Sequence, residues 1–363
     1  MLISTINHVI FRKLLLAWYQ SHQRWLPWRI TNDPYKIWLS EVILQQTRVV
    51  QGLPYYERFI AQYPSVTALA SATEQEILRL WQGLGYYSRA RNLHHCAQTI
   101  VAQYNGIFPT SYRELLTLKG IGPYTAAAIA AVSFKEVVAA VDGNVNRVLA
   151  RIFGLTYDIG TGKGRKQMHQ FATLLVDQIQ PDIYSQAIMD FGALQCTPVS
   201  PCCTACVFNS YCIAFYTDRQ KGLPIKTNTL NKRVRYFDYF VLQYKDLLYM
   251  KKRVESDIWK GMYDFYLVEN KQRWAVDQME DPLLCLVKKH RLSMVTAAKE
   301  AAHLLTHQKL LVKFHKLEVT APFLQEAHAL FNQLSLVAFN RAEVEVLPKP
   351  ILIQNFLKKL DPV

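Results

Sequence analysis

The chain of 363 residues lacks any uninterrupted apolar run of about eighteen residues, which argues against a membrane-spanning helix. Its first 20 residues lack a small-residue cleavage site and carry Arg12 and Lys13 within an amphipathic pattern, unlike a secretion signal. Internal repeats and low-complexity tracts are also missing. We therefore expect an intracellular, cytoplasmic protein of bacterial type that does not insert into a membrane.

Acidic residues are scarce relative to basic ones. The chain has 28 Asp and Glu against 42 Lys and Arg, a formal net charge of +14, and its isoelectric point is near 9.4. Such a surplus favours a polyanionic partner, either nucleic acid or an anionic membrane surface. With 50% hydrophobic residues the chain can bury one large core or two moderate ones, and its length favours about two domains.

The hydrophobic pattern changes along the chain. From Val9 to about residue 195 apolar residues recur at helical spacing, which predicts roughly nine helices joined by short turns. A polar, basic stretch from Thr217 to Arg235 predicts a linker. Beyond it, Tyr236–Tyr244 and Leu247–Met250 predict a hairpin, and Leu310–Val319 a further strand. We therefore expect a helical domain over 1–216, a linker over 217–235 and an α+β domain over 236–363.

Two glycines one residue apart, Gly120 and Gly122, lie between helix-forming stretches. They predict a tight hairpin whose backbone N–H groups can face a phosphate. Asp142 follows at the far end of the next predicted helix and could return beside this hairpin. Together these features indicate a phosphate-binding turn next to a reactive acid.

Four of the seven cysteines lie within residues 196–212 at C-x6-C-x2-C-x5-C spacing: Cys196, Cys203, Cys206 and Cys212. An intracellular chain has little use for structural disulfides, so metal binding by thiolates is the better interpretation. One compact loop with four thiolates favours a cubane iron–sulfur cluster, with zinc and unligated cysteines as alternatives. The cluster would be structural, and Cys202 is expected to be a bystander.

Two carboxylates have both structural and functional interpretations. Glu41, Gln45 and Arg48 fall at i, i+4 and i+7, which predicts one polar stripe that could be either a solvated face or the wall of a base pocket. Asp142 precedes a helical pattern and could be an ordinary N-cap. Neither acid alone establishes a catalytic site.

Several short motifs follow one another along the chain. They are Leu26-Pro27-Trp28-Arg29, Asp33-Pro34-Tyr35, residues 40–47, residues 81–93, the glycine hairpin, Asp142-Gly143-Asn144-Val145 and the cysteine loop. In this order they resemble the helix-hairpin-helix DNA glycosylases related to endonuclease III and, within them, the adenine DNA glycosylases of the MutY type. The resemblance covers nearly the whole chain. It implies a mainly α helix-hairpin-helix domain with a [4Fe-4S] cluster loop, followed by an α+β Nudix-like domain.

The resemblance also implies a reaction, the excision of adenine mispaired with 8-oxoguanine or guanine in double-stranded DNA. The target base must leave the stack to be reached. Glu41 would protonate adenine at N7, and Asp142 would stabilise the oxocarbenium-like sugar, as the second carboxylate of a glycosidase does. Tyr124 and Asn144 would orient the acids and water.

Other roles follow from the same resemblance. Bifunctional relatives carry a lysine where this chain has Tyr124, so no Schiff base can form and a monofunctional enzyme is expected. Backbone amides of Gly120, Gly122 and Tyr124 would hold phosphate. The residues expected to line the adenine pocket or fill the gap in the DNA are Trp28, Arg29, Leu44, Gln46, Tyr86 and Gln186.

The carboxy-terminal part is expected to inspect the base opposite adenine. Residues 259–265 resemble Nudix hydrolases, but no glutamate-rich metal-binding helix follows them, which predicts binding without hydrolysis. Thr306 and His307, with Gln46, are expected to contact 8-oxoguanine; relatives commonly have phenylalanine and serine where this chain has Leu305 and Thr306. The alternative is that His303 and His307 are a surface pair one helical turn apart.

Three functions from different classes fit parts of the pattern. A monofunctional adenine glycosylase explains all of these features together. A bifunctional glycosylase–lyase for oxidised pyrimidines would need the missing lysine, and a non-catalytic DNA-binding protein would have no use for the two acids. A monomer is expected, since one lesion requires one enzyme.

Overall fold

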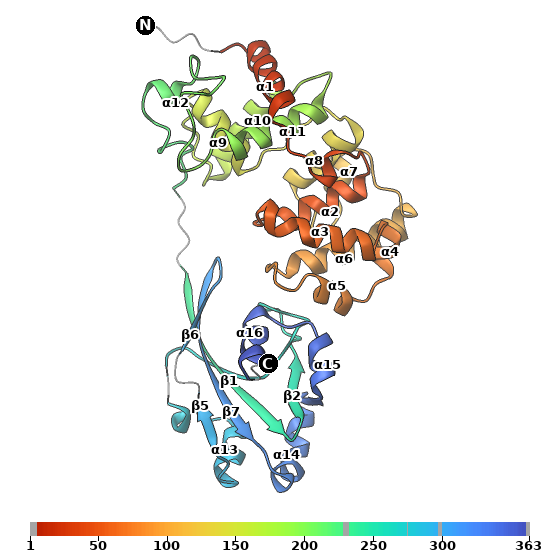
Figure 1. The fold of residues 1–363 in the computed structure, drawn as a ribbon, viewed down its shortest axis with the longest axis vertical. Helices are drawn as coiled ribbons and strands as arrows, with labels where there is room; N and C mark the ends of the chain where they lie inside the picture. Colours follow the sequence, from red (N-terminus) through yellow and green to blue (C-terminus); the bar gives the residue numbers. More distant parts are fainter. Residues whose placement is uncertain (1–5, 228–231, 274, 297–299, 361–363) are drawn as a thin grey trace. The chain divides into compact units, whose positions relative to one another are not determined.

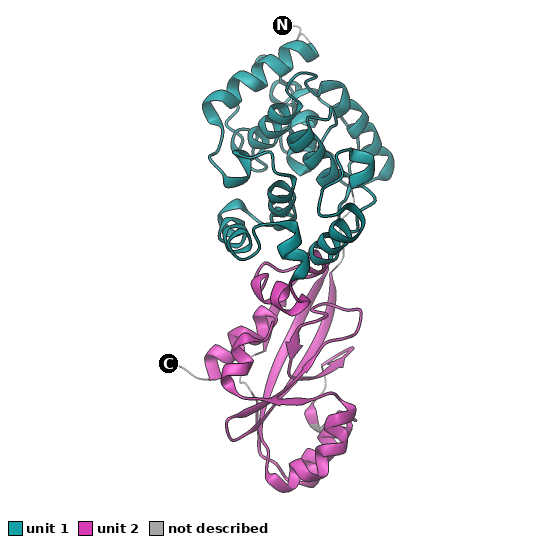
Figure 2. Ribbon diagram, turned by 90° about the vertical axis from the view of Figure 1, so that its right-hand side faces the viewer, with its two compact units in different colours: residues 1–71, 92–229 teal, residues 72–91, 230–363 magenta. Residues whose placement is uncertain are grey.

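The chain forms two compact units in a computed structural model that describes residues 6–227, 232–273, 275–296 and 300–360 (Figure 2). The first unit comprises residues 1–71 and 92–229, and the second comprises residues 72–91 and 230–363. The break between the units at residues 229 and 230 falls inside the predicted linker, of which residues 228–231 lie outside the described residues.

In its described residues the first unit has only helices as regular elements (Figure 1). They are α1 (His8–His22), η1 (Pro27–Arg29), α2 (Pro34–Leu44), α3 (Val49–Gln62), α4 (Val66–Ser71), most of α6 (Ser88–Tyr104), α7 (Tyr112–Leu115), α8 (Pro123–Phe134), α9 (Gly143–Ile152), α10 (Gly162–Leu175), α11 (Pro181–Leu194) and α12 (Ile213–Tyr216). With α5 of the second unit, the described residues up to 194 contain eleven α-helices. The sequence predicted roughly nine because α4 and α7 are too short to show a periodicity.

The helix α8 forms the centre of the first unit. It begins with Gly122 at the N-cap and Pro123 in its first turn, where proline is pre-organised for a helix. All residues from Thr125 to Val132 are buried, because α8 packs against α2, α7 and α11. A helix that is apolar on all sides is stable only in such an interior position.

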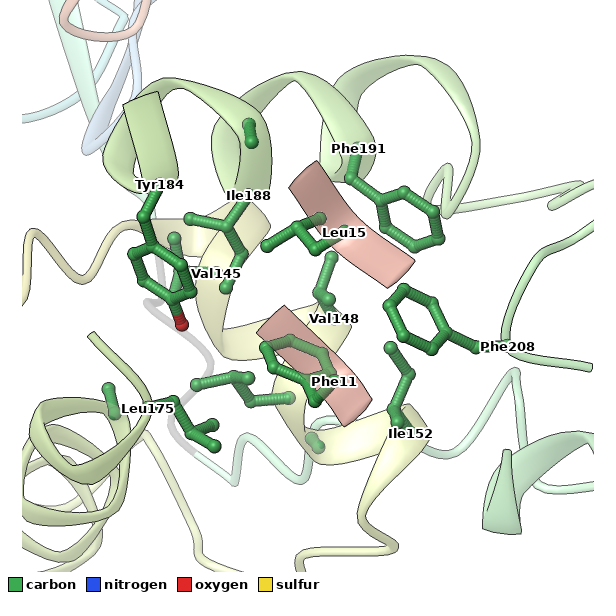
Figure 3. Packing of buried hydrophobic residues seen from close by; sticks show 14 of the residues in the cluster. Phe11, Leu15, Val145, Val148, Ile152, Leu175, Tyr184, Ile188, Phe191 and Phe208 are labelled. Carbon is green, nitrogen blue, oxygen red and sulfur yellow. The ribbon is translucent and has the colours of Figure 1, made fainter. Parts of the chain in front are cut away.

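A second part of the same unit packs around α1, α9, α10 and α11 (Figure 3). Phe11 of α1 and Phe191 of α11 both contact Phe208 of the cysteine loop, with ring centroids 5.1 and 5.2 Å apart. Phe208 is fully buried. The cysteine loop is therefore joined to the hydrophobic core by an aromatic side chain.

The polar stripe predicted for Glu41, Gln45 and Arg48 is wrong. The helix α2 ends at Leu44, Gln45 is its C-cap and Arg48 is the N-cap of α3. The backbone leaves the helical region at Gln45, whose ψ is 115°, and Gln46 follows with a φ of 58°. The Gln45 amide donates instead to Thr125 Oγ1 of α8 at 3.3 Å.

The second unit combines helices with a mixed sheet. Its helices are α5 (Glu74–Leu80), η2 (Val276–Gln278), α13 (Pro282–Lys289), α14 (Ala321–Gln333), α15 (Arg341–Val346) and α16 (Ile351–Leu360). Its strands are β1 (Arg233–Tyr244), β2 (Leu247–Lys252), β3 (Tyr263–Asp264), β4 (Tyr266–Asn270), β5 (Met294–Thr296), β6 (Ala301–Leu304), β7 (Gln308–Glu318) and β8 (Val337–Phe339).

The strands β1 and β7 form the middle of the sheet, whose main order is β3-β2-β1-β7-β5. They pair in parallel from Arg233 opposite Gln308 to Gln243 opposite Glu318. The predicted hairpin is confirmed, since β1 and β2 pair antiparallel with Tyr244 opposite Leu247. The predicted strand at 310–319 is confirmed as β7.

Both faces of β1 are covered, which explains its continuous apolar sequence. Phe240 and Leu242 pack with α13 and α14 on one face. On the other face Tyr239 stacks on Phe314, and Phe314 stacks on Phe356 of α16, with ring centroids 5.4 and 3.9 Å apart. A strand buried on both faces loses the alternation of a half-exposed strand.

Among the described helices, none combines the length and the apolar character needed to cross a lipid bilayer.

Candidate active site

Glu41 lies on α2, a helix whose start is fixed by Asp33. The Asp33 carboxylate accepts the backbone N–H of Tyr35 at 2.9 Å, and Pro34 occupies the first turn. The next turns bury Trp38, Leu39, Val42 and Ile43. The helix therefore holds Glu41 firmly at its partly accessible edge.

Protein atoms surround the Glu41 carboxyl even though part of its surface is accessible. This desolvation raises the pKa of Glu41 to about 7, against the lowering effects of a hydrogen bond with the Tyr124 side chain and of the Arg29 charge. The nearby Asp142 charge also raises it. A carboxyl with a pKa near 7 can carry a proton at neutral pH and deliver it as a general acid.

Tyr124 lies in the first turn of α8, directly after the glycine turn. Its hydroxyl contacts Glu41 and donates to Met189 Sδ at 3.0 Å. Burial raises the Tyr124 pKa well above its ordinary value, with further increases from Glu41 and Asp142. Tyr124 therefore stays neutral and can orient the Glu41 carboxyl.

The predicted glycine turn is present between α7 and α8. Gly120 has a φ of 92°, and a Cβ there would lie 2.7 Å from Cβ of Asn92. Both its backbone conformation and this close approach require glycine. Gly120 and Gly122 are exposed, so their backbone is accessible from solvent.

Asp142 is the N-cap of α9 and also part of the site. Its Oδ1 accepts the N–H of Val145 at 2.7 Å, and its Oδ2 accepts Nδ2 of Asn144 at 2.8 Å. Burial raises the pKa of Asp142, while these hydrogen bonds lower it. The N-cap and the candidate catalytic roles are thus compatible, because one carboxylate serves the helix end through one oxygen.

Further hydrogen bonds connect Asp142 with the cysteine loop. Arg147 donates through Nη2 to Asn144 Oδ1 at 2.8 Å and through Nε to the carbonyl of Cys196 at 2.8 Å. Gly192 lies against Asn144, where a Cβ would approach Asn144 Cβ to 2.6 Å. Asn144 is therefore held between the acid that it contacts and the residues at the end of α11.

Glu41, Asp142, Tyr124 and Arg29 form one electrostatic group, since each influences the ionisation of others in the set. The two acids differ in their surroundings. The Asp142 carboxylate has backbone and amide donors, whereas the Glu41 carboxyl depends mainly on Tyr124. Such a pair of environments separates one proton-donating carboxyl from one anionic carboxylate.

Two of the predicted pocket residues, Arg29 and Gln186, are connected through Tyr19. Arg29 Nη1 donates to the Tyr19 hydroxyl at 3.2 Å, and that hydroxyl donates to Gln186 Oε1 at 3.0 Å. Trp28 is buried with its ring edge-on to Tyr56, at 4.9 Å between centroids. Arg29 and Gln186, far apart in sequence, are thus held side by side.

Leu44 and Gln46 lie where α2 ends. Leu44 packs over Gly52 of α3, where a Cβ would approach Leu44 Cδ2 to 2.8 Å. Gln46 is exposed and has a left-handed backbone conformation. The turn between the two helices thus presents the Gln46 side chain to solvent.

Asp190 was missed in the sequence analysis. It is fully buried on α11 and pairs with Arg29 at 2.8 Å and with Arg24 at 2.5 Å. The available signal was a single acid within the otherwise apolar stretch Ile188-Met189-Asp190-Phe191. A buried carboxylate in such a stretch requires charged or hydrogen-bonding partners.

Replacing Asp190 with asparagine is expected to destabilise the protein. It leaves two arginines without their buried counter-charge, which costs about 3–5 kcal/mol of unfolding free energy. Urea denaturation measures the loss. The control is Asp177→Asn at the looser pair with Arg12, 3.8 Å apart, where a loss of at most about 1 kcal/mol is expected. Equal losses in the two variants would contradict a special role for Asp190.

Three further predicted residues lie in the second unit. Tyr86, with a φ of 50°, is 40% exposed and hydrogen-bonds through its hydroxyl to Thr306 Oγ1. Thr306 and His307 form the turn between β6 and β7. Tyr86, Thr306 and His307 line a cavity of about 480 Å³, and the lining also includes their neighbours within residues 83–88 and 303–308 and residues 257–259.

The alternative of a helical histidine pair is wrong. His303 is on strand β6 and His307 is in the following turn, so they are not neighbours on a helix face. The His303 ring lies 5.9 Å from the Trp259 ring, and burial lowers the pKa of His303.

The four predicted cysteine ligands surround one small cavity, which is also lined by Arg151, Phe191 and Phe215. All four thiols are free of disulfides. Cys196 Sγ accepts from Arg151 Nη1 at 3.6 Å and Cys206 Sγ accepts the N–H of Phe208 at 3.4 Å. In the described residues, no three His, Cys, Asp or Glu side chains are arranged to hold a metal ion.

These contacts fit a thiolate-bound group in two ways. The four cysteines line a single cavity. N–H donors point at the sulfur atoms of Cys196 and Cys206, as donors behind the ligands do around metal-bound sulfur. Arg151 adds positive charge, and its Nη1 and Nη2 also donate to the carbonyls of Thr197 and Pro198 at 2.7 and 3.0 Å.

The helices, the glycine hairpin and the two acids, Glu41 before the hairpin and Asp142 after it, define a class of DNA repair protein. Residues 39–173 match the HhH-GPD family, described as HhH-GPD superfamily base excision DNA repair proteins. A solved structure of a thermostable thymine-DNA glycosylase is similar over 58% of this chain and 97% of its own, with 28% identity and a TM-score of 0.54. A non-covalent endonuclease III–DNA complex, at 20% identity and a TM-score of 0.52, shares the fold.

Sequence relatives narrow this class further. The adenine DNA glycosylase of Buchnera aphidicola from Acyrthosiphon pisum is 34% identical over 266 residues, 72% of this chain and 75% of the relative. The human adenine DNA glycosylase is 40% identical over 222 residues, 59% of this chain and 41% of the relative. The chain belongs to the adenine DNA glycosylase family.

Proposed function

We propose that this protein excises adenine mispaired with 8-oxoguanine or guanine in double-stranded DNA and leaves an abasic site. The observation that carries the proposal is a carboxyl with a pKa near 7, Glu41, grouped with Tyr124 and with Asp142, whose carboxylate accepts two hydrogen bonds. Family membership supports adenine as the base, and the net charge of +14 supports a DNA partner.

In the proposed reaction the adenine leaves the base stack and enters a pocket formed by Trp28, Leu44, Arg29 and Gln186. Protonated Glu41 donates to N7, which turns adenine into a neutral leaving group. The Tyr124 hydroxyl holds the Glu41 carboxyl in place. The contacts of Arg29 and Gln186 with Tyr19 pre-orient two hydrogen-bonding side chains for the base.

Bond cleavage leaves positive charge on the sugar, which Asp142 stabilises as an anion. Asn144 orients the Asp142 carboxylate by donating to Oδ2. Tyr124 cannot form a Schiff base with the opened sugar, so the enzyme does not cut the strand. Backbone amides at Gly120, Gly122 and Tyr124 contact a DNA phosphate.

We further propose that Cys196, Cys203, Cys206 and Cys212 hold a [4Fe-4S] cluster. The convergence of the thiols on one cavity and their N–H donors support it. When bound, the cluster would hold the loop together and carry no step of the base excision. Zinc is the rival group for the same thiolates.

The second unit is proposed to be a Nudix-like domain that inspects the base opposite adenine. Its mixed sheet between helices and the cavity near Tyr86 and Thr306 support this role. Tyr86 would fill the gap left by the flipped base together with Gln46, and Thr306 and His307 would contact 8-oxoguanine. The Thr306 hydroxyl can both donate and accept hydrogen bonds. We propose that the protein works as a cytoplasmic monomer, since one active site serves one lesion.

A single-turnover incubation tests the reaction, with labelled duplexes containing adenine opposite 8-oxoguanine or opposite guanine. Strand cleavage is expected only after hot alkali, and borohydride is expected to trap no protein–DNA adduct. Strand breaks without alkali, with a trapped adduct, would favour the glycosylase–lyase. Binding without any abasic product would favour a non-catalytic DNA-binding protein.

A further inference from the structure

The cavity of the cysteine loop is lined by five cysteines, one more than a four-ligand group requires. The fifth is Cys202, which directly precedes Cys203 and is itself exposed. Cys202 and Cys203 both line this cavity. Cys202 is therefore next to the proposed ligand set in space as well as in sequence.

The other ligands are more firmly anchored than Cys203. In the described residues, Cys196, Cys206 and Cys212 pack against the hydrophobic core that contains Phe208. The Cys203 thiol is supported by a hydrogen bond with the Gln220 side chain. Of the four proposed ligands, Cys203 is thus the one that can be exchanged with least disturbance of the core.

The backbone around Cys202 is held by hydrogen bonds rather than by a helix or a strand. Residues 201–203 belong to no helix or strand. The Cys202 carbonyl is held by Gln195 Nε2, and the N–H of Cys203 bonds to the carbonyl of Pro201 at 3.0 Å. Neighbouring Cα atoms are about 3.8 Å apart, so a shift of this loop by one residue would bring the Cys202 thiol to the place of the Cys203 thiol.

We propose that Cys202 is an alternative ligand that replaces Cys203 in binding the iron–sulfur cluster; this rests on the proposed [4Fe-4S] site. In the exchange, the Cys202 thiol releases its proton to solvent and its thiolate forms a bond to iron. The bond from Cys203 to the same iron breaks, and the Cys203 thiolate takes up a proton. No oxidation state changes, so no redox partner is needed.

Alanine variants of the full chain, purified without oxygen, test the exchange, since alanine cannot ligate iron as serine can. Iron, sulfide and visible absorbance are measured for Cys202→Ala, Cys203→Ala, the double variant and Cys206→Ala as a control with no adjacent cysteine. We expect about four irons per chain in both single variants at 202 and 203, as in wild type. The double variant and Cys206→Ala are expected to lose the cluster.

Iron loss in Cys203→Ala equal to that of the double variant would overturn the proposal. Wild-type protein without iron and sulfide would refute the cluster itself, a result distinct from failure of the exchange alone. Iodoacetamide labelling and mass spectrometry provide a second measure on whatever holoprotein Cys203→Ala yields. Cys202 is expected to be labelled in wild type and protected in Cys203→Ala, and labelling in both would contradict its ligation.

Discussion

Glu41→Gln is expected to reduce the single-turnover rate of adenine excision by about 10²- to 10⁴-fold, the usual contribution of a general acid. Glutamine has nearly the same shape but has no acidic proton to deliver. Binding to the mispaired duplex should persist, because the DNA-contacting residues are unchanged. Alkali-revealed cleavage in a single-turnover time course measures the rate, and Glu57→Gln, an exposed acid on α3, is the matched control.

The same residue predicts the pH dependence of the rate. Since the pKa of Glu41 is about 7, its protonated form predominates below that pH and is lost as the pH rises through 7. The excision rate should therefore fall on the alkaline side, as long as Asp142 remains ionised. Because the two acids are coupled, the profile reports the pair rather than one residue. A wild-type rate that stays level from pH 6 to 9 would contradict Glu41 as the acid.

Asp142→Asn is expected to lower the excision rate by at least about 10²-fold, because it removes the negative charge that faces the developing cation. Asparagine caps helices as well as aspartate does. Its Nδ2 would face the Nδ2 of Asn144 in place of an accepting oxygen, so a modest loss of about 1 kcal/mol in unfolding free energy is expected. Asp142→Asn should thus lose most of its excision rate while it keeps most of its unfolding free energy.

The matched control for Asp142→Asn is Asp33→Asn, which makes the same exchange at the N-cap of α2. It should leave excision near the wild-type rate. Thermal denaturation and single-turnover kinetics on both variants distinguish the two roles. If Asp142→Asn lost activity only in proportion to its folded fraction, Asp142 would be a helix cap and nothing more.

Most residues of the candidate site were predicted from short local sequence motifs. Gly120, Gly122 and Tyr124 could be placed because a helix-turn-helix is determined by neighbouring residues, and Asp142 because an N-cap is a local arrangement. In the structure Glu41, Tyr124 and Asp142 are close enough to influence the pKa values of one another, as the predicted return of the chain requires.

Features that depend on distant contacts were harder to predict. The helix α2 ends at Leu44 because Gln45 and then Gln46 leave the helical conformation, a turn for which the sequence offers no glycine or proline as a signal. The pairing of Asp190 with Arg24 and Arg29 joins residues more than 160 positions apart. The spacing of apolar residues along the sequence does not identify such a partner. A lone acid in an apolar helix shows only that a partner is needed.

The position of residues 72–91 with the carboxy-terminal strands is another long-range feature. Their sequence is helical in period, and α5 begins with a local capping box of Thr73 and Glu76. Helical periodicity predicts that these residues form a helix, but it does not predict which unit of the protein the helix joins. Contacts such as that of Arg91 with the carbonyl of Lys260, at 2.7 Å, are visible only in three dimensions.

Hydrogen bonds run from Asp142 through Asn144 and Arg147 to the Cys196 carbonyl, and they connect the reactive carboxylate with the proposed cluster loop. They run beside α9, about 15 Å long, which has the reactive carboxylate at its start and Arg151, a support of the cysteine loop, near its end. If the loop holds the proposed iron–sulfur cluster, we expect a cell short of iron to make the same amount of polypeptide. The Asp142 carboxylate of that polypeptide would be displaced. The cell's capacity to prevent mutations would then follow its iron supply before any change in protein abundance.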